Sequence, residues 1–528
     1  MSNQSKIVYI QDWMKFHPLT KQSSCDSYYW GICKEVFQII KNEEYEGIVH
    51  GIKGENLKDF ACFLTCYFED VISGTGIWQA FTSAHYEKYG KHLPFYKLDE
   101  YYPDEINPQD IHFLIWYFIS GKFLDEYLSP TSRELIDLGH EIYEIFDREY
   151  ENAPENIKLK TFLTISENET DYYKIRNTMD WLFINSYLFH FQEYEFEREM
   201  QEVLNSEDPE LVRNAEAIAD DFRDFLAVSQ SSNLLAYRGK DWLARVLGKK
   251  HALYADIISL DKRKTGYFLY KGQEGQYVIL QHIATDKVLK VTKRSIDVLP
   301  EFKKDKTIFH INLIKWKNEW WFSGSYTMVN YNEKLIKHEK ESPESIFLFD
   351  DQPSEAKENL ELQYQSFLKF NNNKPIAFFE NGSQIRAFIN QFIEFHNSNI
   401  GLSDKKEKVS DLFLKATEML DIEINDEKFP EILEKQDSVI YFEKNKGSYF
   451  IIGMNAAIPD EENTLYNAES KTDIMDFFFS PNCRPDFVNY IINNYPSIIQ
   501  KYELKTGENF LHNNLDFLLR FWKHEMFD

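Results

Sequence analysis

Near residue 237 the chain changes both its hydrophobic period and the sign of its charge. A fold built only of helices or only of strands is therefore excluded. Before that point apolar residues recur three and four apart, as between Tyr28 and Ile40, a spacing typical of amphipathic helices. After it they stand in short runs bounded by glycine and polar turns, which is typical of strands. We therefore expect an α+β protein with several domains.

Length and ring content agree with that expectation. At about 150 residues per domain, a chain of 528 residues has room for three or four domains. Phe, Tyr and Trp make up 16% of the residues, and each of these rings removes a large area from water when it is buried. A wholly disordered chain is therefore excluded.

Residues 1–236 are expected to form an acidic helical domain. Ser24 or Asp26 is suited to cap its first long helix, and Pro108 stands where the first turn of a helix tolerates a missing N–H. The predicted helices cover 28–40, Leu57–Ile72, Ile77–Tyr89, Asp110–Ile119, Thr131–Tyr150, Asp171–Leu204 and Pro209–Val228.

Residues 237–341 are expected to form a small β-barrel of SH3-like or OB-like type, preceded by a helix over 238–250. The last two strands are joined by Lys317-Asn318-Glu319, a three-residue hairpin connection. The predicted strands lie in Gly266–Gly275, Tyr277–Ile283, Val288–Val291, Ile308–Trp316 and Trp320–Tyr326.

The remaining chain is predicted to hold a linker over 342–357, which has two prolines and a cluster of acids, and a mixed α+β domain over 358–528. Its strand pair is Ser438–Phe442 and Ser448–Met454, with Gly447 in the turn. Its helices are predicted at Glu358–Asn371, Ser383–His396, Val409–Leu420, Pro485–Tyr495 and Asn514–Phe527.

The charge is distributed unevenly. Residues 237–317 hold 18 Lys and Arg against 8 Asp and Glu, a net of +10, while the rest of the chain carries −37. Two uses fit a basic barrel: it binds a polyanion such as nucleic acid, or the acidic helical parts dock on it. The candidate polyanion-binding residues are Lys262, Arg263, Lys264, Lys290, Lys293 and Arg294, with Lys303 and Lys304 further along.

An aromatic run on the last two strands is the candidate partner-binding site. It consists of Trp316, Trp320 and Trp321. Side chains alternate along a strand, so Trp320 and Trp321 point to opposite faces and some of these rings are expected at the surface. Exposed aromatic clusters mark binding sites, although core packing is the alternative for each ring.

Common catalytic motifs are missing from the sequence. It contains no P-loop, no GxGxxG after a strand, and no HExxH, GxSxG or CxxC. Cys62 and Cys66 lie four apart on one helix face, but no second Cys or His pair follows, so we interpret them as core thiols. We expect no cofactor, and an enzyme is the less favoured reading.

Two helices carry acids and a histidine on one face. One set is Asp137, His140 and Glu144, and the other is His190, Glu193 and Glu197. Facing helices of carboxylate-bridged metal enzymes use such ligands, but their Glu-x-x-His order is not reproduced here. A metal-dependent enzyme is one alternative, and solvated or ion-paired helix surface is the other.

The beginning of the chain predicts a cytoplasmic protein. It has no apolar segment of signal-peptide character, and the longest apolar stretches are about half a membrane span. The five cysteines are odd in number and scattered, which does not suggest a disulfide framework.

Several segments together look familiar. They are Ile10-Gln-Asp-Trp13 with His17-Pro18, Ser73-Gly-Thr-Gly-Ile-Trp78, Tyr101-Tyr-Pro-Asp-Glu105 to Trp116, and Lys374-Pro-Ile-Ala-Phe-Phe379. With them the chain resembles an uncharacterised family of long cytoplasmic Bacteroidota proteins, a domain of unknown function. The resemblance implies a bacterial intracellular origin and implies no activity.

We therefore predict a non-enzymatic intracellular binding or scaffold protein that recognises a macromolecular partner, most simply a protein, through the central barrel. The first alternative is a nucleic-acid-binding protein that uses the basic barrel. The second is a metal-dependent enzyme of the helical domain. No membrane partner is expected, and the oligomeric state and the identity of the partner are left open.

Overall fold

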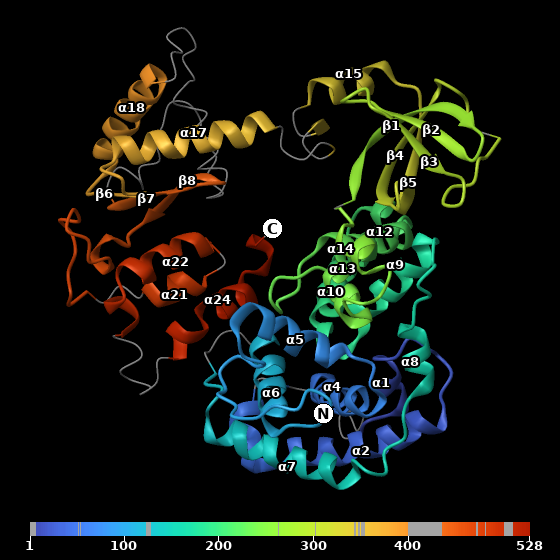
Figure 1. Ribbon diagram of the computed structural model, residues 1–528. Coiled ribbons are helices and arrows are strands. Elements are labelled where there is room, and N and C mark those ends of the chain that lie inside the picture. The colour runs from blue at the N-terminus through green and yellow to red at the C-terminus, as the bar shows by residue number, and fades with distance from the viewer. Residues whose placement is uncertain are drawn as a thin grey trace. The chain divides into compact units, whose positions relative to one another are not determined.

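The computed structural model divides the chain into two compact units, residues 1–349 and residues 350–526 (Figure 1). Within residues 7–527 the structure describes all positions except 51, 53, 123–127, 262, 301, 343–344, 347–348, 350–353, 400–435, 471–473, 481 and 501–509. The predicted fold class is confirmed: a helical region, a five-stranded barrel and a mixed α/β region follow one another. The predicted domain boundaries stay predictions.

The helical region is built around aromatic side chains. Helix α2 begins behind Ser23, whose side chain accepts the N–H of Asp26 while the Asp26 carboxylate accepts the N–H of Ser23. The helices of the helical region are α1 (Ile10–Met14), α2 (Ser24–Ile40), α3 (Glu46–Val49), α4 (Glu55–Ser73), α5 (Ile77–Tyr89), α6 (Pro108–Lys122), α7 (Arg133–Glu149), α8 (Ile157–Leu163), α9 (Tyr172–Asp180), α10 (Phe191–Leu204), α11 (Pro209–Arg213), α12 (Ala215–Ser229), α13 (Gly239–Leu247) and α14 (Tyr254–Ile258). Among the described residues, none of these helices combines the length and the apolar character that crossing a membrane requires.

Two of the predicted helices are broken. The chain between α9 and α10 forms a π-helical turn at Trp181–Asn185 and then becomes extended at Ser186. Nearly all apolar residues of this segment are buried, whereas a straight surface helix buries a single stripe. The break lets these rings enter the core from different directions. Similarly, Asn214 separates α11 from α12 in the segment that was predicted to be one helix.

The barrel closes in the order β1-β2-β3-β5-β4. Its strands are β1 (Lys264–Glu274), β2 (Tyr277–His282), β3 (Val288–Thr292), β4 (Thr307–Trp316) and β5 (Glu319–Asn330). The β3–β5 pair is parallel and the other pairs are antiparallel. This order is that of an OB-type barrel, so the OB-like alternative describes the topology better than the SH3-like one. Phe349, which lies in the predicted linker, packs in the barrel core.

The connection of β4 and β5 is tighter than predicted. Trp316 pairs with Glu319, so the loop consists of Lys317 and Asn318 alone rather than three residues. Both have positive φ, +45° and +67°, as a two-residue type I′ turn requires. The right-handed twist of the two strands favours this turn.

The unit of residues 350–526 has a three-stranded antiparallel sheet in the order β6-β7-β8, with β6 missed by the sequence analysis. Arg484 and Glu443 form a buried ion pair at 3.2 Å within this unit. The helix predicted over Val409–Leu420 lies outside the described residues. The elements are α17 (Ser354–Phe370), β6 (Ile376–Phe379), α18 (Gly382–Asn399), β7 (Ser438–Glu443), β8 (Gly447–Ile452), α21 (Ile474–Phe479), α22 (Pro485–Asn494) and α24 (Phe510–Trp522), with α15 (Glu333–Glu341) in the other unit.

The β4–β5 turn supplies a test of the barrel register. Asn318→Val places a β-branched residue at positive φ, and we expect it to lower the free energy of unfolding by about 1–2 kcal/mol. Asn318→Gly is the matched control, because glycine adopts this conformation freely, and it is expected to keep or raise stability. Urea unfolding of the full chain measures both. Equal stability of the two variants would contradict the two-residue turn.

Candidate functional site

The structure places two of the three candidate tryptophans inside the protein. Trp316 is 1% exposed and Trp321 is 0% exposed. Trp320 is half-buried and packs on the barrel core. Trp321 does point to the outer face of β5, but the rings of Tyr172 and Tyr173 from α9 lie 6.2 and 5.7 Å from its ring. The three indoles therefore do not form an exposed aromatic patch.

The two candidate arginines contact the helical region. Arg263 donates to the Asp221 carboxylate at 3.0 Å and to Asp224 Oδ2 at 3.3 Å. The guanidinium of Arg294 lies 4.6 Å from the centre of the Trp321 ring, and it also donates to Thr170 Oγ1 at 3.4 Å. The Arg263 pairs are those that the docking alternative predicts, whereas Arg294 forms its ion pair with Glu319 on the barrel, at 4.0 Å.

The candidate lysines have different surroundings. Lys290 pairs with Glu274, and Lys293 Nζ donates to the backbone carbonyl of Gly275 at 2.8 Å, so both bind acceptors on the barrel itself. Lys264 is half-buried at the start of β1. Lys262 lies outside the described residues. The structure therefore does not gather the described candidates into one basic face.

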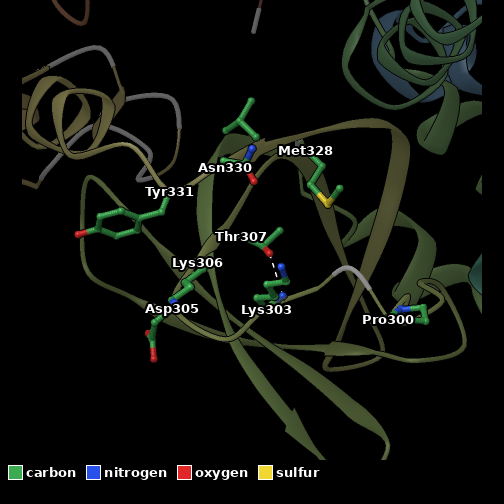
Figure 2. A pocket seen from close by; sticks show the side chains of 9 residues that line it. Pro300, Lys303, Asp305, Lys306, Thr307, Met328, Asn330 and Tyr331 are labelled. Carbon is green, nitrogen blue, oxygen red and sulfur yellow. Dashed lines mark hydrogen bonds between the residues drawn. The ribbon is translucent and has the colours of Figure 1, made fainter.

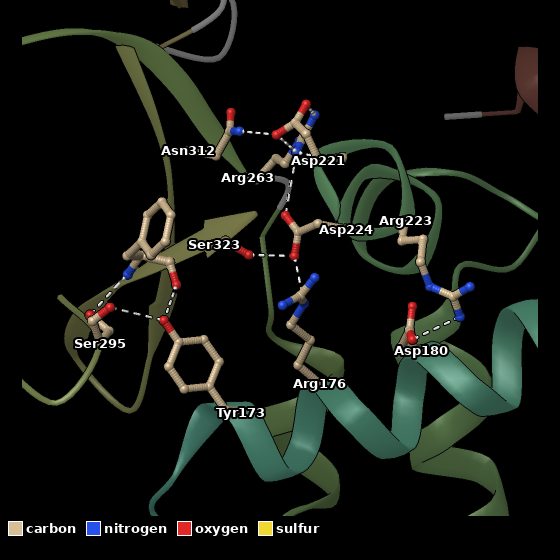
Figure 3. Close-up of polar contacts among 11 residues, drawn as sticks. Tyr173, Arg176, Asp180, Asp221, Arg223, Asp224, Arg263, Ser295, Asn312 and Ser323 are labelled. Atoms are coloured by element: carbon tan, nitrogen blue, oxygen red, sulfur yellow. Dashed lines mark hydrogen bonds and ion pairs between the residues drawn. The ribbon is translucent and has the colours of Figure 1, made fainter. Parts of the chain in front are cut away.

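Asp224 of α12 is the centre of the contact between the helical region and the barrel (Figure 3). Its carboxylate is fully buried. Arg176 of α9 forms an ion pair with its Oδ1 at 2.8 Å, and Ser323 of β5 donates to the same oxygen at 2.6 Å. Arg263, just before β1, reaches the other oxygen. One carboxylate thus joins two helices and two barrel segments.

A bulge in β5 lets the helix come close. The β4–β5 register shifts between Ile311 and Asn312, and Gly324 in the bulged strand has φ of +72°. A Cβ at Gly324 would stand 2.8 Å from Asp221 Oδ1, so a side chain here would push α12 away. Asn312 of β4 donates to the same Asp221 oxygen.

Further hydrogen bonds surround this core (Figure 3). The hydroxyl of Tyr173 donates to the backbone carbonyls of Ser295 and Phe322, at 3.0 and 3.1 Å. Burial raises the pKa of Tyr173 to about 12, so its hydroxyl keeps the proton that these bonds need at neutral pH. Lys317 in the β4–β5 turn donates to the carbonyl of Glu169 at 2.9 Å.

A hollow of about 810 Å³ lies at the other end of the β4–β5 ribbon (Figure 2). Met328 and Tyr331 are 44% and 46% exposed, and they supply apolar surface. Lys303 and Lys306 supply positive charge, whereas Asp305 is paired with Lys271. The lining residues are Pro300, Lys303, Asp305, Lys306, Thr307, Met328, Val329, Asn330 and Tyr331.

The two candidate metal-binding helix faces stay separate. On α7, Asp137 pairs with Arg133 and the His140 ring lies 5.0 Å from the His112 ring. His190 directly precedes α10 and is buried among aromatic rings, with its Nδ1 3.6 Å from Glu193. Neither set brings three ligand atoms together in the described part of the chain.

Sequence reasoning missed one group of metal-compatible residues. His17, Cys66 and Glu69 each offer a ligand atom, and these atoms lie within 4.8 Å of one another, the one such group among the described residues. The spacing of Cys66 and Glu69, three apart on α4, was a signal in the sequence. No sequence signal indicated the contact with His17, which lies about fifty positions away and is brought to α4 by the tertiary structure.

Comparisons with known proteins agree with the resemblance. Residues 7–266 match a family model described as "Protein of unknown function (DUF3843)", which supports an uncharacterised family for this part of the chain. The match covers the helical region up to α14 and the first three residues of β1. No curated protein and no protein of solved structure matches the chain. The Bacteroidota origin stays a prediction.

Replacement of Asp224 tests the contact between the helical region and the barrel. Asp224→Ala leaves Arg176 and Arg263 without their shared buried acceptor, and breaking a buried pair in this way costs about 3–5 kcal/mol. We expect that loss in the free energy of unfolding, measured by urea denaturation. Asp220→Ala is the matched control, because Asp220 is an exposed carboxylate on the same helix. Similar losses for both variants would show that Asp224 has no such role.

Proposed function

We propose that this protein is a non-enzymatic cytoplasmic binding protein whose barrel recognises an acidic segment of a protein partner at the hollow between Lys303 and Tyr331. The observation that supports it is the combination, in one hollow of about 810 Å³, of lysines with exposed apolar side chains. This proposal keeps the barrel as the binding module and moves the interface away from the tryptophans.

The two ends of the β4–β5 ribbon differ in what covers them. At the Lys317–Asn318 turn, Lys317 bonds to Glu169 and Trp321 packs under α9, so that end faces the helical region. At the opposite end, Thr307 pairs with Asn330, and both residues line the hollow. The helical region thus holds the barrel by one end, which leaves the hollow end for a partner.

The lining chemistry favours a protein segment. Lys303 and Lys306 attract carboxylates, and among the described residues neither side chain has an ion pair. Met and Tyr are enriched in the cores of protein interfaces, and the flexible Met side chain adapts to different shapes. A segment that alternates acids with apolar side chains fits a site with both features.

Single-stranded nucleic acid is the second candidate, because OB-type barrels combine basic grooves with rings that stack on bases. However, that use needs several cations free to neutralise phosphates. Arg263 binds acids of the helical region, and Arg294, Lys290 and Lys293 have acceptors on the barrel. The cations left near the hollow are too few to make this the preferred candidate.

Fluorescence anisotropy with the full chain tests the proposal. The probes are a labelled peptide of glutamates interspersed with leucines and a labelled oligo(dT). We expect the peptide to bind, and its Kd to rise about tenfold or more in Lys303→Glu/Lys306→Glu. Met328→Asp is expected to weaken binding as well, because it places a carboxylate against the acidic probe.

The matched control is Lys334→Glu/Lys337→Glu, the same charge change on two exposed lysines of α15 outside the hollow. Its peptide Kd is expected to stay within about twofold of the wild-type value, because exposed charges away from the contact are screened. If wild type binds oligo(dT) more tightly than the peptide, and Lys303→Glu/Lys306→Glu weakens that binding, the partner is nucleic acid rather than a protein. Absence of peptide binding, or equal effects of both double variants, would overturn the proposal.

A further inference from the structure

His17, Cys66 and Glu69 form a buried group in the helical region, remote in sequence from the barrel. His17 lies three residues beyond the end of α1, and α4 carries both Cys66 and Glu69. The side chains of His17 and Glu69 are 4% and 1% exposed, and Cys66 is 5% exposed. Their ligand atoms lie within 4.8 Å of one another.

The hydrogen bonds around this group require a proton or a metal ion between His17 and Glu69. His17 Nδ1 lies 3.1 Å from the carbonyl of Trp13, which can only accept, so this nitrogen carries the hydrogen. His17 Nε2 then faces Glu69 Oε2 at 2.7 Å. In the neutral tautomer both of these atoms are acceptors, so either a proton or a metal ion must lie between them.

The supporting contacts are those that metal ligands have in proteins. A histidine ligand commonly donates its other N–H to a backbone carbonyl, as His17 does to Trp13. A carboxylate ligand is commonly held by a hydrogen bond to its second oxygen, and Asn156 donates to Glu69 Oε1 at 2.9 Å. Both groups are therefore oriented before any ion binds.

We propose that His17 Nε2, Cys66 Sγ and Glu69 Oε2 bind a Zn²⁺ ion. One thiolate, one carboxylate and one neutral imidazole cancel the charge of Zn²⁺, which matters because these side chains are buried. The mixed S, N and O donor set suits zinc better than the harder Mg²⁺ or Ca²⁺ ions. Binding releases the Cys66 thiol proton, and any proton between His17 and Glu69, to the solvent.

The geometry needs a small adjustment. Zn–N and Zn–S bonds of about 2.0–2.3 Å place tetrahedral ligand atoms about 3.3–3.8 Å apart. The ion therefore separates the His17 and Glu69 atoms slightly and draws the Cys66 sulfur inward. A water molecule is the expected fourth ligand. A hollow of about 10 Å³ beside His17, Asp26 and Asn156 has room for about one water next to the histidine.

Metal analysis and Co²⁺ spectroscopy of the full chain test the site. After dialysis against metal-free buffer, we expect about one zinc ion per chain in wild type, since structural zinc binds tightly. Replacement by Co²⁺ is expected to produce a thiolate-to-cobalt charge-transfer band. Cys66→Ser should abolish that band and the stoichiometric zinc, with the circular dichroism spectrum as the check on folding.

Cys62→Ser is the matched control, because Cys62 is a buried free thiol one turn earlier on α4, whose sulfur lies 3.6 Å from the Cys33 sulfur. It is expected to keep both zinc and the cobalt band. If Cys66→Ser does not fold, Glu69→Gln supplies the second test. It should lower the zinc content, and its thiolate-to-cobalt band should be weaker than in wild type or shifted in wavelength. Wild type without zinc and without a cobalt band would overturn the site, as would a band that Cys66→Ser retains.

Discussion

The buried carboxylate of Asp224 determines how the helical region and the barrel fit together. It accepts contacts from α9, from β5 and from the residue just before β1, so no one of these segments can shift without breaking a charged contact. Removing two charges from water is costly, so such a network adds little net stability. The network instead favours one arrangement of the helical region on the barrel, because any other docking would leave Arg176 or Arg263 buried without a partner.

This arrangement explains where the positive charge of the barrel goes. Arg263 and Arg294 turn toward α9 and α12, and Lys317 bonds to the segment before α9. Basic residues of the barrel thus compensate part of the negative charge of the helical region within the same chain. Of the other cations on the barrel, Lys303 and Lys306 lie at the end of the ribbon that carries the hollow.

Two polar clusters of the helical region differ in their charge balance. Around Asp224 and Asp221, two carboxylates meet two arginines, so the cluster is neutral by itself. Around Glu69, a carboxylate and a thiol meet a single imidazole whose second nitrogen is already committed to Trp13. Burial penalises an uncompensated charge, so the Glu69 carboxylate needs either a proton on His17 Nε2 or a bound metal ion, whereas the first cluster is compensated by its own arginines.

Local patterns in the sequence determined most of the secondary structure. Period and capping residues predicted α2, α4, α5, α6 and α7 closely, and alternation predicted all five barrel strands, because these signals act between residues a few positions apart. They failed at Trp181–Asn185, where the need to bury rings on several sides overrides helical continuity. For Trp316 and Trp321 the core alternative holds, because alternation decides which face of the strand a residue takes and not what covers that face.

The tertiary structure alone decided which residues meet. The charge step at residue 237 was visible in the sequence, but the engagement of Arg263 with Asp221 and Asp224 depends on packing segments about forty residues apart. The same holds for His17 and Glu69, which are separated by 52 positions. Composition and spacing set the kinds of side chain available, whereas contacts between distant segments follow from the core packing and the buried charges that the whole fold must satisfy.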